Sequence, residues 1–310
     1  MAEKKLDSIK LNLLREVADL EGVPQGAYSL RVNGETFDRK SSENIVIEKK
    51  TDKPGIDIYI KAGTKRESVH IPVILAESGL REVVYNDFHI GEGADVLIIA
   101  GCGIHNCGVQ DSEHSGVHCF YLGKNSKVKY VEKHYGDGDG NGKNVMNPHT
   151  VVELDEGAYM EMETTQIKGV DSTKRKTDAV LKAKSTLIIH EKIMTHGEQF
   201  AETEFTVDLQ GDDCGTHVVS RSVAKDNSRQ VFISDVKGNS RCSGHTECDA
   251  IIMDNASVVA VPKIVANNTE ASLIHEAAIG KIAGEQLVKL MTLGLDEKQA
   301  EEEIINGFLK

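Results

Sequence analysis

Apolar and polar residues alternate along most of the chain between residues 44 and 268. Short segments such as NIVIEKK, GIDIYIKA, ADVLIIAG and STLIIHEKI repeat this alternation, and Gly, Asn or Asp residues separate them. Successive side chains of a strand point to opposite faces, so a period of two residues is typical of strands with one buried face. The pattern therefore predicts an all-β region over residues 44–268.

The two ends of the chain follow a helical period instead. Within residues 1–43, apolar residues recur at helical spacing until a Gly-Val-Pro turn: Leu6, Ile9, Leu13, Leu14, Val17 and Leu20. Residues 269–310 carry a second helical pattern, in which Gly294 suits the C-terminal cap of one helix. Asp296 and Gln299 form a capping-box pair that begins the next helix. We expect an N-terminal helix and a C-terminal helical hairpin around the β region.

The same short pattern precedes several of the predicted strands and indicates how the strands stack. Each of several strands follows a turn and a small residue, namely Ala94, Ser126, Ala158, Ser185 and Ala256, and the first three of these are 32 positions apart. Small side chains after a turn let successive coils approach closely, as in a parallel β-helix. We predict a right-handed parallel β-helix, with a β-sandwich as the competing architecture.

Composition and charge narrow the classes of function. The 310 residues carry a formal net charge of −13, which argues against general binding to nucleic acid or anionic membranes. No apolar run approaches the roughly 18 residues that a membrane span needs, and the charged N-terminus lacks the apolar core of a signal peptide. We expect a cytoplasmic protein, whose six cysteines serve as metal or redox groups or as buried thiols rather than as disulfides.

The segment RCSGHTECDAIIMD concentrates candidate metal ligands. Cys242, His245 and Cys248 lie at three-residue intervals, and Glu247 adds a carboxylate beside them. The spacing resembles half of a zinc site. A site for sulfur chemistry and two buried thiols remain alternative interpretations.

The segment GCGIHNC is a second concentration of soft ligands, with Cys102, His105 and Cys107 close together and Cys119 a short distance further on. Metal or sulfur binding and structural burial both fit these residues, but the spacings differ from the paired Cys-x-x-Cys knuckles of structural zinc sites. The basic run Lys174–Lys176 is interpreted as a solvated strand face. The chain has no GxSxG elbow, P-loop or HExxH helix, so we expect neither catalysis nor ATP binding by the chain itself.

The C-terminal part of the sequence resembles the SufB/SufD family of iron–sulfur cluster assembly proteins. The resemblance covers residues from about 70 to the end, and its motifs occur in order: Cys248-Asp249-Ala250, Pro262, His275-Glu276-Ala277, Gly280-Lys281-Ile282, Glu285-Gln286-Leu287, Gly294 and Gly307-Phe308. It implies a β-helix that pairs with a second subunit and a helical region, around Lys281–Leu295, that docks a SufC-type ABC ATPase. Leu287 and Leu290 are the apolar residues that we expect to form this docking face.

The resemblance also implies a site for a transient iron–sulfur cluster. Cys248 matches the family's interface cysteine, His275 its interface histidine, and Glu276 the neighbouring carboxylate. Thiolates are the usual iron ligands of such clusters, and His or carboxylate ligands make a cluster easier to release. Cys102, Cys107 and Cys119 are further metal candidates. The resemblance does not show which cysteine accepts sulfur, and Cys102, Cys107, Cys119, Cys214 and Cys242 all remain candidates.

These features lead to three hypotheses of function. The first is a scaffold that forms a homodimer, works with the ATPase, and exchanges sulfur and clusters with donor and acceptor proteins. The second is a SufD-like structural subunit that docks the ATPase without holding a cluster. The third is a β-helix enzyme or carbohydrate-binding protein, which the low aromatic content of 5% and the absence of Trp disfavour.

Overall fold

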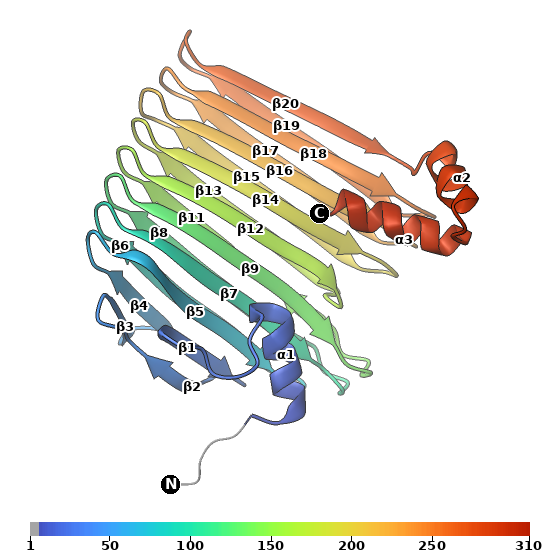
Figure 1. Cartoon of the computed structure of the whole chain (residues 1–310), viewed down its shortest axis with the longest axis horizontal. Coiled ribbons are helices and arrows are strands. Elements are labelled where there is room, and N and C mark those ends of the chain that lie inside the picture. The colour runs from blue at the N-terminus through green and yellow to red at the C-terminus, as the bar shows by residue number, and fades with distance from the viewer. Residues whose placement is uncertain (1–5) are drawn as a thin grey trace.

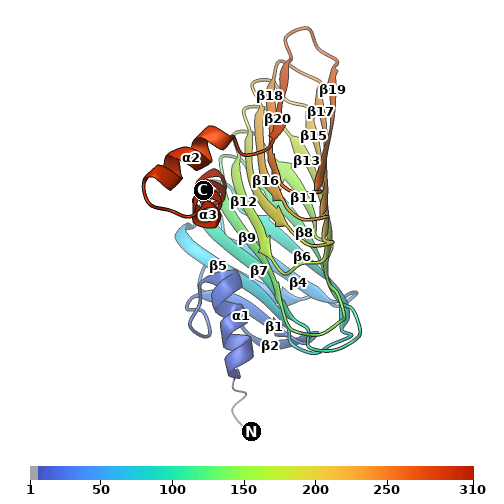
Figure 2. The same cartoon turned by 90° about the vertical axis from the view of Figure 1, so that its right-hand side faces the viewer.

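The computed structural model describes residues 6–310 and is a parallel β-helix of about eight turns (Figures 1 and 2). The strands form two facing sheets, and from Gly55 onward the chain alternates between them, so each coil contributes to both sheets. This arrangement confirms the predicted β-helix over the sandwich, because nearly all neighbouring strands run parallel. Apolar side chains that point inward from both sheets form a core cluster that extends along the axis, from Ala27 to Cys248.

Ten strands make up the first sheet, here called sheet A. In spatial order they are β2 (Glu35–Lys40), β1 (Ala27–Val32), β5 (Lys65–Leu75), β7 (Asp95–His105), β9 (Lys127–Asp137), β12 (Tyr159–Lys168), β14 (Thr186–Thr195), β16 (Gly215–Ala224), β18 (Ser243–Ile252) and β20 (Ser272–Gly280). Only β1 and β2 pair antiparallel in this sheet.

The second sheet, sheet B, faces sheet A across the core. Its strands are β19 (Ser257–Ala266), β17 (Arg229–Gly238), β15 (Phe200–Leu209), β13 (Ser172–Leu181), β10 (Asn144–Met146) with β11 (His149–Leu154), β8 (Ser112–Leu122), β6 (Arg81–Ile90), β4 (Gly55–Ile60) and β3 (Ile45–Lys49). β10 and β11 both lie between β8 and β13, and only β3 and β4 pair antiparallel.

The predicted column of small residues exists at the entry to sheet A. Each member immediately precedes a strand of that sheet, and the strands pair in register, so the residues stack one above another: Ala94, Ser126, Ala158 and Ser185. Cys214 and Cys242 continue the same column before β16 and β18. Ala256 differs from the prediction, because it precedes β19 and therefore belongs to sheet B.

Helix α1 (Ser8–Ala18) lies where the sequence predicts a helix and packs on the outer face of sheet A. Asp7 caps its first turn, and its buried side chains include Leu13 and Val17. Two glycines of β7 make this contact possible. A Cβ on Gly101 would lie 2.3 Å from the Val17 carbonyl oxygen, and one on Gly103 would lie 3.1 Å from the Leu13 Cβ.

The C-terminal region differs in part from the expected hairpin. Residues 272–280, which the helical pattern assigned to a helix, form strand β20, because they pair in register with β18 as the last strand of sheet A. The helical part begins only at α2 (Gly284–Thr292) and continues with α3 (Glu297–Phe308), which begins with the predicted capping box. Sheet structure also begins earlier than residue 44, since β1 already pairs with β5. Figure 2 shows all three helices on the side of sheet A.

The β-helix is open at its C-terminal end. β19 and β20 are the last strands of their sheets, and no described element covers the last coil. Exposed apolar side chains lie on both faces of these two strands, with Val259, Val261 and Ile274 on the outer faces and Ile264 and Ile279 on the inner faces. Among residues 6–310, no helix has the length and apolar character required to cross a lipid bilayer.

Candidate functional site

Cys248 and His275 lie close to the open end and share the inner face of sheet A. Cys248 belongs to β18, and His275 belongs to the edge strand β20. His275 pairs with Thr246, which lies two residues before Cys248 on the same face. Strand spacing and rise per residue place the two Cα atoms about 8 Å apart. The structure therefore brings together the predicted cysteine and histidine.

The thiol of Cys248 is buried beneath the last coil. Burial, together with the negative charges of Glu191 and Asp249, raises its pKa to about 12. The sulfur is consequently protonated at neutral pH in the isolated chain. An iron ion bound at this position must displace the proton, because the thiolate is the form that ligates metal.

His275 carries a ring nitrogen without a partner. Its Nδ1 lies 2.7 Å from the Thr246 hydroxyl oxygen, whereas its Nε2 is buried and has no hydrogen-bond partner. Burial and the nearby His245 lower the pKa of the imidazole, which favours the neutral, metal-ligating form. The free nitrogen lies on the same inner face as Cys248 and next to the open end.

Glu276 does not join this pair. It follows His275 directly in β20, so its side chain points to the outer face of sheet A, where it is 66% exposed. There its Oε2 lies 3.5 Å from the His245 Nε2. Within one chain, the three predicted cluster residues therefore occupy two faces of the same sheet.

The alternation of faces along β18 also separates the candidate ligands of the segment RCSGHTEC. Cys242 and Cys248 point inward, whereas His245 and Glu247 point outward, since three residues along a strand reverse the face. The half zinc site suggested by the spacing is therefore not assembled. Cys242 belongs to the column of small residues, which supports the interpretation as a buried thiol.

A charged network runs through the core behind Cys248. Within sheet A, the inward positions of one column are Glu132, Thr164, Glu191, Ser220 and Cys248. From sheet B, Arg175 forms an ion pair with Glu132, and its Nε lies 3.6 Å from the Glu191 Oε1. The Ser220 hydroxyl donates to Glu191 at 2.8 Å.

The sequence interpretation missed this network. Lys174 is exposed and Lys176 is half-buried on the outer face, but Arg175 between them is buried, because the alternation of the strand turns it inward. Burial by itself raises the pKa of the Glu132 carboxyl. The charges of Arg175 and His134 outweigh this effect and hold the pKa well below its usual range. An isolated basic residue in a β segment gives no sign of its carboxylate partners in other coils.

Cys102 and Cys119 do not form a common site. Cys102 points into the core from β7, where burial and the carboxylates Glu82 and Glu132 raise its pKa. Cys119 points outward from β8 in sheet B, beside Asp87 and Tyr121. The two glycines that flank Cys102 serve the packing of α1, so part of the GCG motif has a structural explanation.

Cys107 has the geometry of an activated thiol. It is exposed in the loop after β7, and its Sγ lies 3.0 Å from the His105 Nε2. The other ring nitrogen of His105, Nδ1, lies 2.7 Å from the Asp137 Oδ1. A carboxylate at Nδ1 favours the tautomer whose Nε2 accepts the thiol proton. The thiol also contacts Asp139, whose pKa it lowers.

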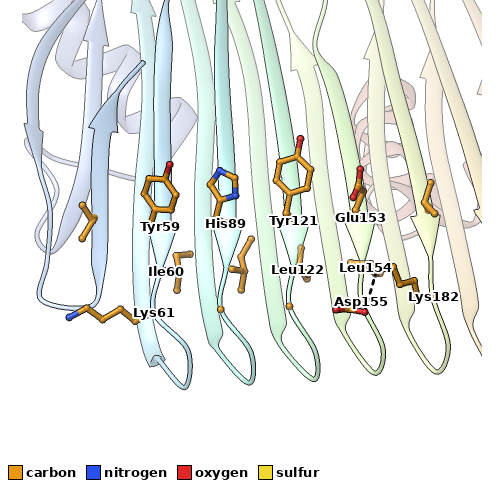
Figure 3. A pocket seen from close by; sticks show the side chains of 15 residues that line it. Tyr59, Ile60, Lys61, His89, Tyr121, Leu122, Glu153, Leu154, Asp155 and Lys182 are labelled. Atoms are coloured by element: carbon orange, nitrogen blue, oxygen red, sulfur yellow. Dashed lines mark hydrogen bonds and ion pairs between the residues drawn. The ribbon is translucent and has the colours of Figure 1, made fainter. Parts of the chain in front are cut away.

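A separate hollow lies on the outer face of sheet B (Figure 3). Tyr59, His89 and Tyr121 occupy register positions on adjacent coils and stack with ring centroids 4.8 and 5.3 Å apart. Figure 3 shows their rings in one row, followed by Glu153. None of the predicted cluster residues lines this hollow.

Comparison with known proteins adds independent information. A family profile described as "SUF system FeS cluster assembly, SufBD core domain" matches residues 79–308. A protein of Methanocaldococcus jannaschii named as an iron–sulfur cluster assembly SufBD family protein is 28% identical over 278 residues, which are 88% of this chain and 87% of that protein.

Two further relatives carry the same family name. The one from Pyrococcus horikoshii is 29% identical over 238 residues, covering 76% of this chain and 71% of the relative. The one from Archaeoglobus fulgidus is 26% identical over 266 residues, covering 84% and 70%. The matched region includes β6 to β20, both C-terminal helices and every residue of the open end.

Proposed function

Because this chain belongs to the SufBD family and thereby has a role in iron–sulfur cluster assembly, we propose that it is a scaffold subunit on which a transient cluster forms. The observation that carries the proposal is the position of Cys248 and His275 on one inner face beside the open end of the β-helix. A soft sulfur ligand and a free imidazole nitrogen suit iron. The chain itself is then a non-enzymatic scaffold that acts in the cytoplasm.

Pairing of two chains completes the site in this proposal. The edge strands β19 and β20 leave a row of backbone groups unpaired, and exposed apolar side chains border them. Such edges are covered in stable proteins, and a second copy supplies a matching surface. A homodimer would bring two copies of Cys248 and His275 to one interface, where Glu276 of each chain is also exposed.

Helix α2 is the proposed contact with a SufC-type ABC ATPase. Its exposed apolar residues are Val288 and Met291, and Leu293 follows at its C-terminal end. Nothing on the described chain packs over them, which supports docking of a partner protein. Hydrolysis of ATP by the partner would then separate or rearrange the paired ends and free Cys248 from its buried, protonated state.

Sulfur enters at Cys107 in this proposal. The thiol of Cys107 gives its proton to His105 and attacks the terminal sulfur of a donor persulfide. The new S–S bond forms on Cys107 as the donor's S–S bond breaks, and the protonated imidazole returns the proton to the departing thiolate. The exposure of Cys107 and its contact with His105 support this role. The finished cluster passes to an acceptor protein.

The test is a measurement of iron and acid-labile sulfide per chain after anaerobic reconstitution. Wild type, Cys248→Ser and His275→Ala are compared with Cys214→Ser, a control that changes a buried thiol in the small-residue column. We expect cluster in the wild type and the control, and its loss in folded Cys248→Ser.

The other outcomes are equally informative. Equal cluster content in the wild type and Cys248→Ser would refute Cys248 as a ligand. No cluster in any variant, with the ATPase still bound, would replace the scaffold by a SufD-like structural subunit. The burial and protonation of Cys248 in the isolated chain are the observations that favour this second candidate.

A further inference from the structure

A second group of potential metal ligands lies on the outer face of sheet A. His217 of β16 and His245 of β18 are register partners, and their rings stack with centroids 5.0 Å apart and planes 9° from parallel. Glu247 lies two residues beyond His245 on the same face. One ligand atom from each of the three residues lies within 4.8 Å of the other two, and among residues 6–310 no other such group occurs.

The hydrogen bonding of these residues is incomplete. The His217 Nε2 lies 3.3 Å from the Glu247 Oε1. The His245 Nε2 is buried and has no hydrogen-bond partner, and the carboxylate oxygens nearest to it, on Glu247 and Glu276, lie 3.8 and 3.5 Å away. At these positions neither carboxylate forms a hydrogen bond with the His245 ring, so the Nε2 is left facing two carboxylates without a partner. The ligand atoms of both stacked rings and of the Glu247 carboxylate lie close enough together for one metal ion to contact all three.

We propose that His217, His245 and Glu247 bind a divalent first-row transition metal ion, with Glu276 of the edge strand as a fourth ligand. Two imidazoles and one carboxylate on one face are a donor set that suits Zn(II) and Fe(II) and leaves positions for water. The backbone positions are held by the in-register pairing of β16, β18 and β20, so only side-chain adjustment is needed.

The site adjoins the proposed cluster ligands through the thickness of one sheet. Glu247 precedes Cys248 in β18, and Glu276 follows His275 in β20, with each pair pointing to opposite faces. A groove lined by Glu161, Glu163 and His190 leads to it. If the proposed scaffold function holds, the natural ion is iron, which is held here next to the point of assembly. The identity of the ion rests on that function, but the metal site does not.

The experiment is a titration of the untagged, metal-free full chain with Co(II) and with Zn(II) under anaerobic conditions. Calorimetry gives the affinity and the number of ions, and the Co(II) absorption spectrum reports whether thiolate is a ligand. The variants are His245→Gln, Glu247→Gln and Cys248→Ser. His149→Gln is the matched control, because His149 also pairs with a carboxylate on an outer sheet face, at 2.8 Å from Asp178.

We expect one ion per chain without thiolate ligation, and a loss of affinity of more than about tenfold in His245→Gln and in Glu247→Gln. Cys248→Ser and His149→Gln should bind as the wild type does. Wild-type affinity in both ligand variants would overturn the site, as would loss of binding in Cys248→Ser or a failure of the wild type to bind either ion. The cluster measurement and this titration can fail independently, so each tests its own proposal.

Discussion

A single buried guanidinium, that of Arg175, joins carboxylates from different coils inside the β-helix. It reaches Glu132 of β9 and Glu191 of β14 from the opposite sheet, and all three side chains are almost fully buried. Charges removed from water are tolerated only when they are paired. The network therefore makes the two sheets depend on each other at this level of the core.

Replacing Arg175 tests this dependence. Arg175→Met keeps most of the side-chain volume but leaves Glu132 and Glu191 without their cation, and we expect a loss of about 3–5 kcal/mol in the free energy of unfolding. Lys174→Met is the control on the same strand, because that side chain is 65% exposed, and its effect should stay below about 1 kcal/mol. Denaturant unfolding of both variants measures the two losses. Equal free energies of unfolding for Arg175→Met and Lys174→Met would mean that the network does not stabilise the fold.

The buried histidines make the fold sensitive to acid. Burial lowers the pKa of His118 to about 4, although the negative charge of Glu132 acts to raise it. The unfolded chain therefore binds a proton at higher pH than the folded chain does. The free energy of unfolding is unaffected by His118 above the ordinary histidine pKa of about 6.5. It decreases as the pH falls from there toward 4, because the unfolded chain takes up the proton first.

The expected size of this effect is about 2 kcal/mol between about pH 7.5 and about pH 5. Unfolding midpoints measured at both pH values should show a smaller decrease for His118→Gln than for the wild type. His196→Gln, which changes an exposed histidine, should keep the wild-type pH dependence. An unchanged dependence in His118→Gln would assign the acid sensitivity to other groups.

Among the elements, α2 differs most from an ordinary surface helix. Val288 is 60% exposed and Met291 43%, and Leu293 beyond the helix is 76% exposed. Leu287 and Leu290, the residues expected from sequence to form the docking face, are half-buried instead. Val288 and Met291 are therefore the residues that we assign to the proposed docking face.

We expect Val288→Asp and Met291→Asp to weaken binding to the proposed ATPase partner by at least about tenfold, because each would place a charge in the proposed apolar contact. Gln286→Asp adds the same charge at an exposed polar position of α2 and should bind normally. Affinity is measured by calorimetry or by co-elution with the purified ATPase. Normal binding by both apolar variants would exclude this face of α2.

At the scale of the whole molecule, the open end is the main asymmetry. The N-terminal coils carry α1 on their outer face, whereas the last coil exposes its inner positions and its strand edges. A mass of twice 33.8 kDa by light scattering is the expected result for the proposed pairing.

Two substitutions at the open C-terminal end of the β-helix test whether the proposed dimer interface lies there. Val261→Lys and Ile274→Lys should shift the protein to the monomer, since each adds a charge at an exposed apolar edge. Val83→Lys is the matched control, because Val83 of β6 is 45% exposed and Val261 is 46% exposed. A wild-type protein that remains monomeric at high concentration would contradict the homodimer.

Much of the architecture follows from the sequence. Alternating polarity, turn residues and the small residue before each strand led to a β-helix with terminal helices, and the structure confirms it. The main error is the strand at residues 272–280. Its alanines suit a helix by propensity, but pairing with β18 overrides that weak preference.

The candidate site was predictable only in part. Motif resemblance found Cys248, His275 and Glu276, but it did not separate their faces. The contact between Cys107 and His105 could be guessed from their proximity in sequence, whereas Asp137, 32 residues beyond His105, could not. The His217–His245 pair gave no signal, because 28 residues separate its members.

The sequence by itself determined which residues face the core within each strand, because that choice depends only on local alternation. The tertiary structure alone decided which residues meet across coils. Register partners in sheet A lie 27 positions apart from β12 to β14 and 32 from β9 to β12, as the pairs of Tyr159 with Thr186 and of Tyr159 with Lys127 show. A site built from several coils depends on that variable spacing, and backbone hydrogen bonds between strands set it rather than any local pattern of side chains.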